Sequence, residues 1–313
     1  MHTKNETRIV FMGSPQFAVP SLKVLIENSY NVVAVVTVPD KPKGRGLKLE
    51  ASEVKKVAQS YNIPILQPEK MKDKLFIQEM EKIDPSIIIV VAFRILPPEI
   101  YKLGKLGSFN LHASLLPKYR GAAPINWAII NGEEKTGITT FFLEDKVDTG
   151  SIIFQEEIDI NENENYGDVY DKLSQLGASL VIKTVDAIIE NKANTTIQEK
   201  ANITLAPKIF KDDCLINWDS PSKVIHNRIR GLSPYPTAFT RYDNKNIKIF
   251  KSEPTNKKSN NNTGYISTSK NEIFVSCADY ELKILELQIE GKKRLKSEEF
   301  LRGFQFPENA CFY

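Results

Sequence analysis

The chain has 313 residues, of which 41% are hydrophobic and 26% charged, a composition that suits two globular domains with a substantial core. Its net charge of +3 at pH 7 is too small to indicate a nucleic-acid-binding protein by itself. The longest purely apolar run, 87–93, is far too short to span a bilayer and the first residues are polar, so we expect a cytoplasmic protein without membrane contact.

Runs of apolar residues alternate with helix-like stretches through the first half of the chain. We predict strands at 8–12, 32–38, 65–66, 87–92 and 107–111, separated by helices at 19–28, 52–61 and 72–82. This alternation is typical of an α/β fold with a doubly wound, mostly parallel sheet. Gly13 is the only glycine between Met12 and Pro39, so the three-glycine fingerprint of dinucleotide binding is absent and we exclude a nicotinamide-dependent dehydrogenase.

The stretch 39–49, PDKPKGRGLKL, separates the second strand from the next helix. Its prolines and glycines argue against regular structure, and four basic residues give it a positive charge. They are Lys41, Lys43, Arg45 and Lys48. A solvated loop is one interpretation, and a loop that binds the phosphates of a nucleic acid is the other.

Residues 109–124, FNLHASLLPKYRGAAP, contain the strongest candidate site. On a strand, Asn110 and His112 lie two residues apart and therefore on one face. An amide can hydrogen-bond a developing oxyanion, and an imidazole can carry protons at neutral pH. Asp148 lies in a loop between predicted strands at 136–143 and 152–158. By themselves, such a pair and such an aspartate are more often ordinary structure than catalytic groups.

The second half of the chain begins with a predicted helix at 125–131, and a longer helix at 166–190 closes the first domain. We predict a catalytic domain at 1–193, a linker at 194–212 and a second domain at 213–313. The second domain combines a helix near 221–229 with short strands at 237–241, 246–252, 264–268, 272–277 and 282–288, and a polar loop at 254–263. Such strands suit a small, OB-like β-barrel.

The second domain has a net charge of about +4. Two groups of residues predict a basic face: Arg228 with Arg230, and Lys292 and Lys293 with Arg294. A solvated surface is the alternative explanation of this charge. The three cysteines, Cys214, Cys277 and Cys311, are widely spaced and form neither a disulfide nor a zinc pattern, so we expect no metal.

Four segments in order resemble the signature of the 10-formyltetrahydrofolate-dependent formyltransferases, and the resemblance covers nearly the whole chain. They are Asn110-Leu-His112, Ser114-Leu-Leu-Pro117, Arg120-Gly-Ala-Ala-Pro124 and Asp148-Thr149-Gly150. The resemblance implies catalytic roles for Asn110, His112 and Asp148. It also implies a folate slot lined by Phe93, Arg94, Ile95 and Leu96 and by Ser114, Leu115, Leu116 and Pro117.

One part of the folate slot departs from the family pattern. Phe93 and Arg94 stand where a tyrosine-glycine pair is common, and the loop is one residue shorter. Backbone recognition of the pterin ring tolerates that change better than recognition by side chains.

The basic loop resembles the one with which methionyl-tRNA formyltransferases contact the acceptor end of tRNA, and the small barrel resembles their tRNA-binding domain. The implied reaction is attack of the α-amine of initiator methionyl-tRNA on the formyl carbon of 10-formyltetrahydrofolate. Asn110 and protonated His112 would stabilise the oxyanion by roughly 3 to 4 kcal/mol per donor. Asp148 would hold the useful tautomer of His112 and help to move the proton. No cysteine lies near the signature, so we expect direct transfer and no covalent formyl-enzyme. We expect the protein to be a monomer.

Three alternatives share parts of this pattern. Glycinamide ribonucleotide formyltransferases share the Asn, His and Asp set but generally lack the basic loop and the second domain. Formyltransferases that act on nucleotide-linked amino sugars can have a small carboxyl-terminal domain. A catalytically inactive RNA-binding homologue is the third, and the intact Asn110, His112 and Asp148 argue against it.

Overall fold

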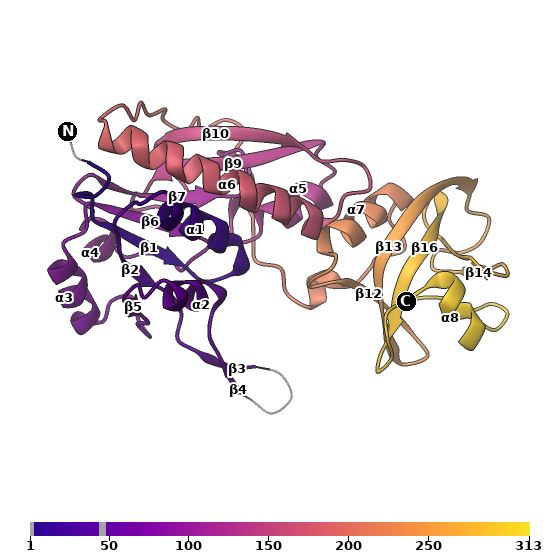
Figure 1. The fold of residues 1–313 in the computed structure, drawn as a ribbon. Coiled ribbons are helices and arrows are strands. Elements are labelled where there is room, and N and C mark those ends of the chain that lie inside the picture. The colour runs from indigo at the N-terminus through magenta and orange to yellow at the C-terminus, as the bar shows by residue number, and fades with distance from the viewer. Residues whose placement is uncertain (1–2, 44–47) are drawn as a thin grey trace. The chain divides into compact units, whose positions relative to one another are not determined.

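The computed structural model describes residues 3–43 and 48–313. The chain forms two compact units that alternate along the sequence (Figure 1). The first unit comprises Met1–Gly121, Gly137–Ile158 and Tyr170–Leu205, and the second comprises Ala122–Thr136, Asp159–Val169 and Ala206–Tyr313. The contiguous domain boundaries at 193 and 213 stay a prediction.

The first unit is built on a seven-stranded sheet. Its order is β10 (Ile152–Asp159), β9 (Lys135–Phe142), β7 (Gly107–His112), β6 (Ile87–Val91), β1 (Ile9–Gly13), β2 (Val32–Val36) and β5 (Ile65–Leu66). The pairings from β7 to β5 are parallel, and β9 runs antiparallel to β7. The predicted doubly wound, mostly parallel sheet is therefore confirmed. The strand order reverses between β1 and β6, so their carboxyl ends flank the switch point where such sheets bind ligands.

Helices cover both faces of this sheet. They are α1 (Val19–Glu27), α2 (Glu53–Ser60), α3 (Lys74–Ile83), α4 (Pro98–Tyr101) and α6 (Tyr166–Ile189), with a 3-10 turn η1 (Gln16–Ala18). Phe76 of α3 and Ile100 of α4 pack on the face that carries Val10 and Val90. On the other face, α6 approaches β7 so closely that a Cβ on Gly177 would lie 2.6 Å from Leu111.

The basic stretch after β2 contains regular structure that the sequence did not predict. Sequence analysis expected no regular structure at 39–49, and that expectation is wrong. β3 (Lys41–Lys43) and β4 (Lys48–Glu50) pair antiparallel, with Lys41 opposite Glu50. A proline fits this ribbon because each strand of an isolated pair is an edge strand and leaves half of its amides unpaired.

The predicted linker also contains structure that the sequence did not indicate. β11 (Leu205–Ala206) pairs with β8 (Arg120–Gly121), and Thr196 forms a bridge with Ile152. Backbone hydrogen bonds therefore attach this segment to the first unit, and it is not an unstructured linker.

The second unit is an antiparallel sheet with three helices and a 3-10 turn. The strands are β12 (Ala238–Tyr242), β13 (Lys245–Lys258), β14 (Ile266–Thr268), β15 (Ile273–Ser276), β16 (Tyr280–Ile289) and β17 (Leu295–Lys296). The other elements are α5 (Pro124–Ile130), η2 (Asp212–Cys214), α7 (Ser222–Leu232) and α8 (Ser297–Gly303). The sheet order is β12-β13-β16-β15-β14, with β17 on β16.

The last residues of the chain join the two ends of that sheet. Tyr313 exchanges backbone hydrogen bonds with Arg241 on β12, and the amide of Phe312 donates to the carbonyl of Gly264 just before β14. This closure gives the second unit the barrel-like core that the sequence predicted. The predicted loop at 254–263 is shorter than expected because β13 continues through register shifts to Lys258.

Candidate active site

Strand β7 presents Asn110 and His112 on one face, as its two-residue period requires, while Phe109 and Leu111 are buried on the other. His112 is only 6% exposed. Asn110 is partly exposed, and its side-chain amide has no hydrogen-bond partner among the described residues. The strand therefore offers an uncommitted amide donor beside an enclosed imidazole.

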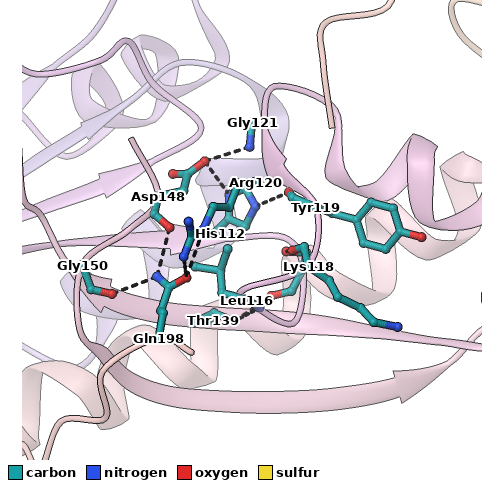
Figure 2. Close-up of polar contacts among 11 residues, drawn as sticks. His112, Leu116, Lys118, Tyr119, Arg120, Gly121, Thr139, Asp148, Gly150 and Gln198 are labelled. Atoms are coloured by element: carbon teal, nitrogen blue, oxygen red, sulfur yellow. Dashed lines mark hydrogen bonds and ion pairs between the residues drawn. The ribbon is translucent and has the colours of Figure 1, made fainter. Parts of the chain in front are cut away.

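Two groups from distant loops flank the imidazole (Figure 2). His112 Nε2 lies 2.9 Å from the carbonyl oxygen of Tyr119, and Nδ1 lies 3.8 Å from Oδ2 of Asp148. A carbonyl can only accept, so Nε2 carries the hydrogen. Sequence analysis expected Asp148 to set the tautomer, whereas the Tyr119 carbonyl occupies the position that does so. Nδ1 is the nitrogen left to gain or lose a proton beside the carboxylate.

Both flanking residues have an unusual backbone. Tyr119 has φ of 59° and Asp148 has φ of 55°, in the left-handed region that few residues other than glycine enter. Oδ2 of Asp148 accepts a hydrogen bond of 2.9 Å from the amide of Gly121. The loop after β7 therefore holds both sides of the ring, through Tyr119 on one side and through Asp148 on the other.

The loop after β6 contains the first half of the predicted folate slot. The Arg94 guanidinium donates to the carbonyls of Pro68 and Glu69 at 2.7 and 2.9 Å, and burial lowers its pKa. Leu96 joins the core, whereas Ile95 is 73% exposed. The amides of 93–96 donate to no group among the described residues. This loop therefore offers a row of backbone donors and one apolar side chain to a ligand.

The second half of the predicted folate slot, 114–117, is held in place by hydrogen bonds to other protein groups. Ser114 Oγ donates to the Lys118 carbonyl at 2.6 Å, and Gln155 Nε2 donates to the Leu116 carbonyl at 2.9 Å. Ser114 and Leu116 are buried, while Leu115 and Pro117 are partly exposed. Ser114 and Leu116 therefore shape the wall, and only Leu115 and Pro117 offer exposed side-chain surface.

Three of the four predicted basic residues lie on the β3–β4 ribbon. Lys41 is exposed, and the backbones of Lys43 and Lys48 pair with each other. Arg45 lies outside the described residues.

Comparison with family models shows the family to which the chain belongs. Residues 7–185 match the Formyl transferase family model, and residues 208–305 match the model of the Formyl transferase C-terminal domain. The chain belongs to the formyl transferase family. Its Asn110, His112 and Asp148 lie within the first matched region, and the barrel-like sheet lies within the second.

Relatives in this family share the full length of the chain. A methionyl-tRNA formyltransferase of Bacteroides fragilis is 50% identical, and the alignment covers 97% of both chains. One from Flavobacterium johnsoniae is 46% identical over 98% of this chain and 99% of the relative. Among solved structures, the sugar 3N-formyl transferase WlaRD, determined with dTDP and 5-N-formyl-THF, has a TM-score of 0.68 and 25% identity. That match covers 92% of this chain and 99% of WlaRD.

The second unit of this formyl transferase contains a cavity of about 560 Å³ that the sequence did not predict. Two aromatic side chains in its wall, Phe210 and Tyr235, are 62% and 77% exposed, and Lys211 and Lys248 line the same cavity. Lys208 Nζ lies 5.3 Å from the centre of the Phe210 ring. Exposed rings among cations are the usual means of binding unpaired nucleotides.

The basic face predicted for this unit is partly wrong. Arg230 is buried and donates to the side chain of Asn227 and the carbonyl of Glu164, so it serves the fold. Arg294 pairs with Glu286. Lys292, Lys293 and Arg294 are exposed, whereas Arg228 is partly exposed and donates to the carbonyl of Asp213.

Two further findings concern metals and membranes. Within residues 3–43 and 48–313, no group of three His, Cys, Asp or Glu side chains could hold a metal ion. In the same described ranges, each helix is too short or too polar to cross a bilayer.

Proposed function

We propose that this formyl transferase moves the formyl group of 10-formyltetrahydrofolate to the α-amino group of methionyl-initiator tRNA. The observation that carries the proposal is the set of Asn110, His112 and Asp148 at the end of β7, in a chain with methionyl-tRNA formyltransferase relatives at 50% identity over 97% of its length. The amino-sugar alternative is supported by WlaRD, but at 25% identity.

The loop after β6 fits a folate ring. The free amides of 93–96 are donors for the carbonyl and ring nitrogens of a pterin, and the exposed Ile95 offers an apolar contact. Since Arg94 is already bound to two carbonyls, this recognition uses backbone more than side chains. The 5-N-formyl-THF in the WlaRD structure supports a folate as the formyl donor.

The site's own groups account for the transfer. The amine attacks the formyl carbon, a C–N bond forms, and the bond to N10 breaks. The Asn110 amide, which is uncommitted, donates to the oxygen that becomes negative. His112 Nδ1 takes a proton from the attacking amine and returns one to N10, while Asp148 at 3.8 Å stabilises the imidazolium. A positive imidazolium also favours the oxyanion.

Two surfaces would hold the tRNA. The basic stretch 39–49, which includes the β3–β4 ribbon, carries Lys41, Lys43, Arg45 and Lys48 for phosphate contacts. The cavity wall of the second unit, with Phe210 and Tyr235 between lysines, suits unpaired nucleotides. A monomer acting in the cytoplasm remains our prediction.

The test is formyl transfer by wild type and by a double variant, Asn110→Ala with His112→Ala. Both proteins are given 10-formyltetrahydrofolate with methionyl-initiator tRNA or, separately, with a nucleotide-linked amino sugar. We expect wild type to formylate only the tRNA, and the double variant to lose at least about a hundredfold in rate while still binding tRNA. Formylation of the sugar alone would transfer the assignment to the amino-sugar alternative.

A further inference from the structure

Gln198 lies in the segment that the sequence marked as a linker, yet it is buried beside the active site, with only 7% of its surface exposed. Among the described residues, its side chain forms a hydrogen bond neither with His112 nor with the carboxylate of Asp148. Its side chain instead bonds to the two loops that flank the imidazole (Figure 2).

Both ends of the Gln198 side-chain amide form hydrogen bonds: the oxygen faces donors and the nitrogen faces acceptors. Oε1 accepts from Nε and Nη2 of Arg120, at 3.1 and 2.6 Å. Nε2 donates to the backbone carbonyls of Asp148 and Gly150, at 2.9 and 2.8 Å. A guanidinium needs an acceptor and two carbonyls need a donor, so only an amide satisfies both sides.

Thr204, six residues later, bonds to the other flanking loop. Its Oγ1 accepts from the amide of Tyr119 at 2.8 Å, and its carbonyl accepts from the amide of Arg120 at 3.0 Å. One segment thus holds the Tyr119 carbonyl on the Nε2 side of the imidazole and the Asp148 turn on the Nδ1 side.

Both held residues have the left-handed backbone described above, which persists only where surrounding bonds require it. At Asp148 the carboxylate has a bond from the Gly121 amide, and the residue's own carbonyl has the bond from Gln198. Loss of the second bond would free the turn to relax and move Oδ2 away from Nδ1.

We propose that Gln198 is a positioning residue for the formyl transfer: through Arg120 and the carbonyls of Asp148 and Gly150, it sets the distance between the Asp148 carboxylate and His112 Nδ1. The inference rests on the proposed function for its reaction. Because both ends of the Gln198 amide are bonded to protein groups, we expect Gln198 to act on the chemical step and not on substrate binding.

The informative variant is Gln198→Glu. The carboxylate has nearly the same size as the amide and still accepts from Arg120. It has no hydrogen to donate to the carbonyls of Asp148 and Gly150, and its oxygen repels them. We expect kcat for methionyl-initiator tRNA to fall at least tenfold, with the KM of both substrates within about twofold of wild type, since small displacements of a catalytic group cost that much.

The matched control is Tyr30→Phe, which removes one partly buried hydrogen bond, from the Tyr30 hydroxyl to Asp186. Tyr30 precedes the amino end of β2, whereas His112 lies at the carboxyl end of β7. It should lower the melting temperature and leave kcat unchanged. If Gln198→Glu keeps kcat within twofold of wild type, or raises KM without lowering kcat, the positioning role is overturned.

A second readout does not need turnover. The chain has three histidines, so the imidazole signals of His112 can be assigned by NMR against a His112→Gln protein. We expect Gln198→Glu to shift these signals and Tyr30→Phe to leave them in place. Unchanged signals in Gln198→Glu would overturn the inference, whereas a wild-type protein that formylates no tRNA would overturn only the proposed function.

Discussion

Two histidines in the described part of the chain are buried, one in each unit, and they show what separates a structural imidazole from a reactive one. His226 is 4% exposed and His112 is 6% exposed, so burial does not distinguish them. His226 Nδ1 lies 3.1 Å from the Ser252 hydroxyl and Nε2 lies 3.5 Å from the Glu162 carbonyl. Burial, followed by the charge of Arg230, lowers the pKa of His226.

The groups that face the ring nitrogens, and not the extent of burial, distinguish the two histidines. Both nitrogens of His226 face neutral groups, whereas His112 has a neutral carbonyl on one side and the Asp148 carboxylate on the other. The partly exposed Asn110 lies beside His112 on the same strand face. A carboxylate and a free amide around one ring are therefore better evidence of catalysis than an enclosed histidine.

The strongest test of this contrast replaces each histidine by glutamine. His112→Gln should lower kcat by about 10³-fold, because it removes the proton carrier and the positive imidazolium that favours the oxyanion. His226→Gln should leave kcat within about twofold of wild type, since the ring faces only groups of its own unit. Rates of formyl-methionyl-tRNA production check both, and equal losses would contradict the contrast.

Two carboxylates of the loop between β9 and β10 allow a second test. Asp148→Asn should lower kcat by about 10² to 10³-fold, because the imidazolium loses its negative partner. Asp145→Asn is the matched control in the same loop, where the carboxylate accepts only from the Tyr101 hydroxyl, at 2.6 Å. A comparable loss of kcat in both variants would show that the loop is merely destabilised.

A smaller effect should come from the cavity of the second unit. Lys211→Glu and Lys248→Glu should each raise the KM for charged tRNA several-fold, keep kcat, and reduce the salt slope of binding by about one. Lys270→Glu, on an exposed turn outside the cavity wall, is the control. Equal KM values for the three variants would mean that the change in KM depends only on net charge. The cavity would then not be part of the surface that binds tRNA.

The smallest effect concerns stability against pH. Since the folded pKa of His226 is lowered, the unfolded chain binds more protons than the folded one below the ordinary histidine value near 6.5. The free energy of unfolding should therefore fall on acidification from pH 7 to pH 5, by at most about 1.4 kcal/mol per pH unit from this group. Denaturant unfolding of His226→Gln should have a flatter profile, and parallel profiles would contradict the assignment.

Periodicity was enough to predict most of the elements. The alternating apolar runs gave the strands β1, β2, β6 and β7, and the helix α1 begins at Val19 as predicted. The two-residue period of a strand also placed Asn110 and His112 on one face. Short elements that depend on distant partners, such as β8 with β11, have no comparable pattern and were missed.

Charge patterns were less informative than periodicity. Arg230 and Arg94 looked like ligand-facing cations, but each is bound to backbone carbonyls that come from other parts of the chain. The Phe210 and Tyr235 pair was not recognised because the sequence does not show which aromatic side chains are exposed, and their exposure exists only in the folded unit.

The sequence by itself therefore determined the parallel sheet, the histidine and amide on β7, and, through its motifs, the reaction class. Tertiary structure alone decided that the Tyr119 carbonyl fixes the tautomer of His112 and that Gln198 supports the Asp148 turn. Side-chain type and spacing are written in the sequence, so local geometry can be predicted. A backbone carbonyl is the same at every residue, and which one meets a given side chain depends on how loops 7 to 50 residues apart come together.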